Sequence, residues 1–227
     1  MKRIVEPELL DDLLPADSRA IQSRRDLQRL NFFMGSVGIV ARKLERSFDE
    51  TPKKIVDLGA GGGTFMLQLA KRLANRWKNV EVVLVDRQAL VSPGTKEEIL
   101  QLGWRIQIIS ADVFDWISRC DTVDCIVTNL FLHHFEPEKL SELLRLASEK
   151  TKVFLACEPR RSFAGTIGAK FIWMIGCNEV TRHDAPVSVR AGFREKEISE
   201  LWPRSGNWKI EEASAGFFSH TFCARKL

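Results

Sequence analysis

The 227-residue sequence lacks any apolar stretch that approaches the roughly 20 residues of a membrane-spanning helix. Its first residues, MKRIVEPELLDD, also lack the apolar segment of a secretory signal peptide. Internal repeats and low-complexity tracts are absent, and the net charge of +4 is spread along the chain. We therefore expect a cytoplasmic protein with no membrane span, whose mildly basic charge permits nucleic acid binding without implying it.

The sequence also lacks cysteine pairs at metal-binding spacing. The five cysteines are odd in number, far apart and never arranged as C-x-x-C. Neither a disulfide framework nor a zinc site is indicated, and no His/Asp cluster argues for another metal. With 44% hydrophobic residues, the chain is long enough for one substantial α/β domain.

The most informative segment that is present is KIVDLGAGGGT, residues 54–64. An apolar run of the kind found in buried parallel strands ends at Leu58, and four glycines follow at Gly59, Gly61, Gly62 and Gly63. Glycine permits positive φ angles and a close approach of the backbone to a ligand. Residues 64–76 then place Phe65, Leu69 and Leu73 on one helical face. The order strand, glycine turn, helix indicates a nucleotide-binding loop.

Two residues of this loop disfavour a dinucleotide site. A dinucleotide fingerprint needs glycine or alanine at the sixth place of G-x-G-x-x-G, where this chain has Thr64. Asp57 would repel a pyrophosphate but would favour a cationic ligand.

Strands and helices alternate along most of the chain. Further strands are expected at residues 80–85, 106–110, 123–128, 153–156, 208–213 and 217–224, and helices at 95–102, 137–148 and 196–202. The alternation predicts a parallel sheet wound on both faces. Only a short turn, around residues 214–216, separates the last two strands, which should therefore form an antiparallel hairpin.

An acidic residue before G-x-G-x-G, polar residues at later strand ends and a terminal hairpin together resemble the class I S-adenosylmethionine-dependent methyltransferases. The later polar residues are Asp86, Asp112, Asn129 and Glu158. The resemblance covers residues 52–227 and implies a Rossmann-like α/β fold with seven strands in the order 3-2-1-4-5-7-6, strand seven antiparallel. It also implies S-adenosyl-L-methionine as the cofactor.

Cofactor-binding residues are expected at the carboxyl ends of the strands, where doubly wound sheets hold their ligands. The resemblance assigns Asp57, Gly59, Ala60 and Gly61 to the cofactor loop. Asp86 ends its strand where an acidic residue chelates the ribose hydroxyls, although it could instead be a turn carboxylate.

The adenine end of the cofactor is expected next to the third strand. Arg87 could cover the adenosine or be solvated. Asp112 matches the position that accepts a hydrogen bond from the adenine amino group, and Val113 would offer its backbone N–H. The alternative for Asp112 is a cap on the helix that follows.

The acceptor side is expected where the fourth strand runs into Asn129 and the segment LFLHHF. Asn129, also assigned to the cofactor site, is followed by no prolines, and no Pro-Cys dipeptide is present, so methylation of nucleic acid bases is disfavoured. The pair His133-His134 resembles the L-H-H of quinone-type and other small-molecule methyltransferases. At most one of two adjacent side chains should face the reaction centre. A histidine there could be a general base for a phenol or enol, or could only pack.

Other candidates lie after the fifth strand. His183 precedes Asp184 and is a secondary catalytic candidate, provided that the backbone turns sharply there. The segment 165–177, with Phe171 and Trp173, is either a core helix or a lid over an apolar acceptor pocket.

Residues 1–51 are expected to form a helical lead-in that covers the cofactor, or a helix pair that only packs, ahead of a methyltransferase domain at 52–227. The sequence thus predicts an enzyme that methylates a small apolar or aromatic hydroxyl or enol compound, without a metal. An RNA or protein methyltransferase, and a cofactor-binding protein without activity, remain alternatives.

Overall fold

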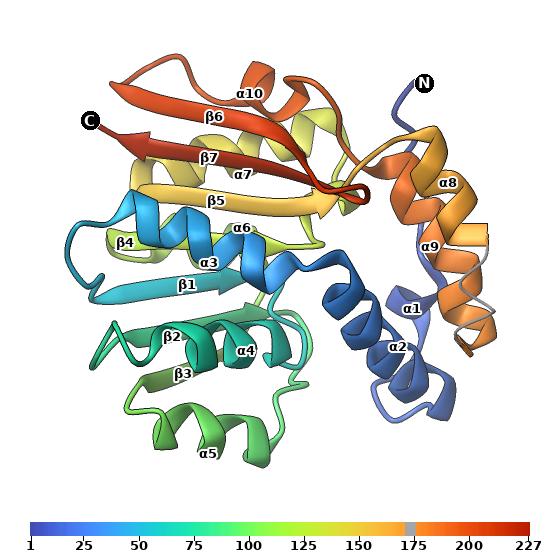
Figure 1. The fold of residues 1–227 in the computed structure, drawn as a ribbon, viewed down its shortest axis with the longest axis horizontal. Helices are drawn as coiled ribbons and strands as arrows, with labels where there is room; N and C mark the ends of the chain where they lie inside the picture. The colour runs from blue at the N-terminus through green and yellow to red at the C-terminus, as the bar shows by residue number, and fades with distance from the viewer. Residues whose placement is uncertain (171–175) are drawn as a thin grey trace.

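The computed structural model describes residues 1–170 and 176–227, and its centre is a seven-stranded sheet (Figure 1). The strand order is β3-β2-β1-β4-β5-β7-β6, as the sequence predicts. The strands are β1 (Lys54–Leu58), β2 (Glu81–Asp86), β3 (Arg105–Ser110), β4 (Val123–Asn129), β5 (Thr151–Pro159), β6 (Trp208–Ala215) and β7 (Ser219–Lys226). β1 to β5 are parallel, and β7 is antiparallel to both β5 and β6. The predicted fold class is therefore confirmed.

Helices cover both faces of the sheet (Figure 1). One face packs against α3 (Ser36–Ser47), α4 (Thr64–Leu73) and α5 (Pro93–Gln101). The other face packs against α6 (Val113–Arg119), α7 (Pro137–Lys150) and α10 (Glu197–Leu201). Each face buries its own apolar cluster, as expected for a sheet that is wound on both sides.

The remaining helices lie beyond the carboxyl ends of the parallel strands (Figure 1). They are α1 (Leu9–Asp12), α2 (Ser18–Met34), α8 (Phe163–Lys170) and α9 (Glu179–Ala191). Polar contacts join α2 to α9. The Thr181 hydroxyl donates to Ser23 Oγ at 2.9 Å, and the backbone N–H of Asn178, the N-cap residue of α9, donates to Asp26 at 2.7 Å. Of the two helices expected in the lead-in, α2 therefore lies over the strand ends, whereas α3 packs on the sheet.

Gly35 separates these two helices with φ of +67°, in the left-handed region that glycine tolerates best. Among the described residues, no helix combines the length and the apolar character that crossing a membrane requires.

Candidate active site

A cavity of about 1320 Å³ opens at the carboxyl ends of β1, β2 and β4. Its floor is formed by residues from these strand ends and from the glycine loop, including Asp57, Asp86 and Asn129. The N-terminal segment forms other walls of the cavity, with residues such as Val5, Leu10 and Asn31. The lead-in therefore lines the cavity, and its expected role as a cover over the cofactor stays a prediction.

The glycine loop is held in place by Phe131 and Asp86. Gly59 has φ of +74°, and a Cβ at this position would lie 2.2 Å from the Phe131 ring. Asp86 accepts hydrogen bonds from the amides of Gly61 and Gln88, both at 2.9 Å. Asp86 is therefore a turn carboxylate, and it also lines the cavity where ribose hydroxyls were predicted to bind.

Asp57 has a buried carboxylate that faces the cavity without a partner. It is only 2% exposed, and its Oδ2 atom has no hydrogen-bond partner among the described residues. Burial and the nearby charge of Asp86 raise the pKa of Asp57 well above its ordinary value. An unpaired buried carboxylate is costly, so a positively charged ligand would stabilise it. This donor set fits S-adenosylmethionine, which carries a sulfonium and an ammonium group.

Asp112 has the capping role considered for it, whereas its contact with adenine stays a prediction. It caps α6 by accepting a hydrogen bond from the Phe114 amide at 2.8 Å, and it lines the cavity together with Val113. Ala60 and Arg87 line the same cavity. All nine residues assigned to the cofactor from the sequence therefore meet around one space.

Asn129 connects the end of β4 to the lead-in. Its Nδ2 donates to Asn31 Oδ1 of α2 at 3.1 Å, and its Oδ1 is buried with no partner among the described residues. Leu130 follows with φ of +54°, an uncommon conformation outside glycine that is typical of functional turns.

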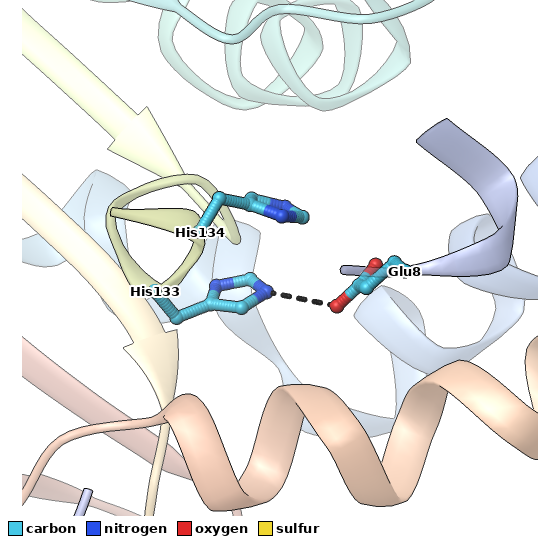
Figure 2. Close-up of side chains that lie close together, drawn as sticks. All are labelled: Glu8, His133 and His134. Atoms are coloured by element: carbon cyan, nitrogen blue, oxygen red, sulfur yellow. Dashed lines mark ion pairs between the residues drawn. The ribbon is translucent and has the colours of Figure 1, made fainter. Parts of the chain in front are cut away.

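His133 lies outside the cavity lining and is held between two carboxylates. It belongs to the 3-10 turn η1 (Leu132–His134), and its Nδ1 lies 2.8 Å from Glu158. On the other side of the ring, its Nε2 lies 3.4 Å from Glu8 (Figure 2). Burial disfavours the imidazolium, but hydrogen bonds to Glu158 and Glu8 outweigh it and raise the pKa of His133 to about 9. The same contact overcomes the burial of Glu8 and lowers its pKa to about 2. This environment makes His133 a buried cation and argues against a role as general base.

His134 is the histidine that faces the cavity. Its side chain is 27% exposed, its Nδ1 lies 3.6 Å from Asp11 Oδ2, and its ring lies against that of His133 with centroids 4.3 Å apart. Burial, followed by the positive charge of His133, lowers the pKa of His134. The surroundings therefore favour a proton on His133 and disfavour one on His134, and of the two only His134 lines the cavity.

Glu8, His133 and His134 bring ligand atoms within 4.8 Å of one another, a spacing that a metal ion could bridge. However, both ring nitrogens of His133 already face carboxylates, which pair with a proton on each nitrogen. A metal ion would have to displace the contact with Glu8. The prediction that the site has no metal ligands stays a prediction.

His183 is placed outside the cavity. Its Nδ1 lies 2.9 Å from Asp184, as the adjacent pair suggested, but the helix α9 continues through both residues. Asp184 instead accepts hydrogen bonds from the amides of Leu9 and Leu10. The structure therefore does not support a catalytic role for His183. Phe171 and Trp173, considered for a lid, lie outside the described residues.

The sequence did not reveal that Glu8 and Asp11 contact the two adjacent histidines, or that Asn31 contacts Asn129. Glu158, one of the polar strand-end residues of the resemblance, accepts hydrogen bonds from the amides of Phe131 and Leu132, at 3.1 and 2.9 Å, in addition to its contact with His133. Glu158 thus fixes the turn that carries both histidines.

The strand order, the acidic glycine loop and the cavity at the strand ends together define the fold of class I S-adenosylmethionine-dependent methyltransferases. Comparison with known proteins agrees. Residues 55–152 match the family model of a methyltransferase domain. This part of the chain carries the glycine loop, Asp86, Asp112 and both adjacent histidines.

A curated relative is carboxy-S-adenosyl-L-methionine synthase of Nautilia profundicola, 24% identical over 114 residues. The match covers 50% of this chain and 47% of that protein, so the chain matches about half of its relative's length.

Two similar solved structures cover most of this chain. The plantazolicin methyltransferase BpumL, in complex with a triazolic desmethylPZN analog and SAH, has a TM-score of 0.67 and 16% identity over 93% of this chain and 92% of that one. Magnesium protoporphyrin IX methyltransferase of Synechocystis, with bound SAH, has a TM-score of 0.58 and 13% identity over 86% and 84%. At these identities, the likeness shows a shared fold.

Proposed function

We propose that this protein is an enzyme that binds S-adenosylmethionine in the cavity and transfers its methyl group to a small molecule. The acceptor is an apolar or aromatic compound with a hydroxyl or enol group, and His134 is the general base. The observation that carries the proposal is that one cavity holds both Asp57, whose Oδ2 has no partner among the described residues, and the accessible His134, whose pKa is lowered.

The cofactor would lie along the floor of the cavity. Asp57 would face its positive charges, Asp86 its ribose, and Asp112 with the Val113 amide its adenine. When bound, S-adenosylmethionine supplies an activated methyl group on its sulfonium. The similar structures with bound SAH support this choice of cofactor.

The acceptor would lie between η1 and the N-terminal segment. Leu10, Phe131 and Phe135 give this part of the cavity an apolar surface, which favours an apolar or aromatic compound and reduces the amount of water near the reacting atoms. A hydroxyl or enol loses its proton during methylation, and a neutral histidine at the cavity surface can accept that proton. Residues of the cavity would otherwise act by aligning the two ligands.

Calorimetry with S-adenosylmethionine and with NAD tests the cofactor. The protein should bind S-adenosylmethionine and should not bind NAD. No binding of S-adenosylmethionine at about millimolar concentration, which means a binding free energy weaker than about −4 kcal/mol, would overturn the proposal. Labelled methyl groups should then pass to the small-molecule fraction of a lysate. Transfer to RNA or protein would replace the proposed acceptor class, and transfer to no fraction would favour a binding protein without activity.

His134→Gln tests the base, with His183→Gln as the matched control outside the cavity. Turnover should fall by about 10²- to 10⁴-fold in His134→Gln and stay at the wild-type level in His183→Gln. Affinity for S-adenosylmethionine should be retained in both variants. Wild-type turnover in His134→Gln would remove the general base from the mechanism.

A further inference from the structure

The one-turn helix α1 is fixed by α9. Asp184 of α9 accepts the Leu9 amide through Oδ1 at 2.9 Å and the Leu10 amide through Oδ2 at 3.0 Å. Ser188, one turn further along α9, donates a hydrogen bond to Glu8. Because the first amides of α1 are bound by one buried carboxylate, the position and direction of this short helix are well defined.

The same helix brings two carboxylates to the two adjacent histidines. Glu8 is the N-cap residue of α1, in an extended conformation, and Asp11 lies three residues later in the single turn of that helix. Glu8 meets His133 at 3.4 Å, and Asp11 meets His134 at 3.6 Å. Figure 2 shows the two histidine rings extending side by side from η1 toward Glu8. Of the two carboxylates, Asp11 is the one that lines the cavity.

We propose that Asp11 is a positioning residue for His134, so that the lead-in segment completes the catalytic centre. This inference rests on the proposed function. Asp11 faces Nδ1 of His134, which favours the tautomer with its proton on Nδ1 and leaves Nε2 as the acceptor. A distance of 3.6 Å is long for a hydrogen bond, and such catalytic contacts commonly shorten once substrate is bound.

The chemical step balances with these groups. The acceptor oxygen forms a bond to the methyl carbon as the carbon–sulfur bond breaks, and the electron pair of that bond stays on sulfur. The acceptor's proton moves to Nε2 of His134. Asp11 takes up no proton in this step and, in its ionised form, stabilises the imidazolium, which is the role of the carboxylate in a histidine–carboxylate pair.

Several charged groups act on His134, and their signs determine the expected pH effect. Glu8 at the N-cap of α1, Asp11 of α1 and Glu158 of β5 raise its pKa, whereas His133 of η1 lowers it. Burial raises the pKa of Asp11 itself, as do the charges of Glu8 and Asp184, whereas the charges of His134 and Arg87 lower it. Replacing Asp11 by a neutral residue removes one negative charge and leaves the positive charge of His133, so the pKa of His134 should fall.

The test compares Asp11→Asn with Asp12→Asn, a neighbour on the same helix that is exposed, as Asp11 is, but does not line the cavity. In Asp11→Asn, kcat should fall about tenfold, which corresponds to about 1.4 kcal/mol of activation free energy. The acid limb of the pH–rate profile should shift to lower pH, and the affinity for S-adenosylmethionine should stay unchanged. Asp12→Asn should match the wild type. A purely structural role for Asp11 would not shift the acid limb.

A second readout does not depend on activity, and therefore separates a failure of this inference from a failure of the proposed function. The chain has only four histidines, so their NMR titrations can be assigned by mutation. The pKa of His134 should be lower in Asp11→Asn than in the wild type and in Asp12→Asn. An unchanged pKa of His134, or an unchanged kcat and pH profile in an active enzyme, would overturn the positioning role.

Discussion

The buried ion cluster Glu158–His133–Glu8 gives the fold a pH dependence that can be calculated and tested. The His133 side chain is 3% exposed, so the cluster is screened little by water. The pKa of His133 rises from 6.5 to about 9 in the folded protein. Each pKa unit corresponds to about 1.4 kcal/mol, so the protonated ring contributes about 3 kcal/mol to stability.

The direction of this pH dependence follows from proton binding. Because the folded state binds the proton of His133 more tightly than the unfolded state, this stabilisation is complete below the unfolded pKa of 6.5. It is lost as the pH rises toward and through about 9. Glu8 sets the acid limit: its pKa falls from 4.5 to about 2, so its contribution is present above 4.5 and is lost as the pH falls through 2.

Urea unfolding between about pH 6 and pH 10 measures this effect in the wild type and in His133→Gln. The difference in unfolding free energy between the two proteins should shrink by about 3 kcal/mol over that range. His183→Gln, which alters an exposed histidine, should follow the wild-type curve. If His133→Gln does not fold, Glu8→Gln provides a milder change that should remove part of the pH dependence. Parallel curves for wild type and cluster variants would refute a charged His133.

Two further predictions concern the glycine loop and Asp57, the acidic residue before it. Asp57→Asn should weaken S-adenosylmethionine binding by about 1.5–3 kcal/mol, the usual contribution of a charge-assisted interaction, and calorimetry showing unchanged affinity would remove Asp57 from the site. Gly59→Ala should lower thermal stability more than Gly61→Ala. Both positions have positive φ, costing about 1–3 kcal/mol, but only a Cβ at Gly59 would meet the Phe131 ring, at 2.2 Å. Equal melting temperatures for the two variants would contradict that difference.

The sequence was sufficient to predict the sheet and the residues at the floor of the cavity because both depend on local patterns. An apolar strand, an acidic residue and closely spaced glycines identify the end of β1, and the short connection before β7 indicates the terminal hairpin. Asp57, Asp86 and Asp112 could be placed together because parallel strands bring their carboxyl ends to one edge.

The part of the cavity around His134 could not be predicted in the same way because it depends on contacts between segments that are distant in the sequence. Whether His133 or His134 faces the cavity is decided by the short turn η1, which Glu158 of β5 holds through backbone amides. Glu8 and Asp11 lie more than a hundred residues earlier in the chain, and no sequence periodicity links them to the histidines. His183 contacts Asp184, but α9 continues through both residues and places His183 outside the cavity, which the adjacent pair alone could not indicate.

The contact between Gly59 and Phe131 joins the two halves of the cavity mechanically. Phe131 packs against the glycine loop on one side and begins the segment that carries His134 on the other. A ligand that fixes the glycine loop therefore also restricts the acceptor side. Thermodynamic linkage makes such coupling reciprocal, so cofactor and acceptor should each increase the affinity for the other by the same factor. An acceptor affinity measured without the cofactor would then underestimate the affinity of the cofactor-bound protein.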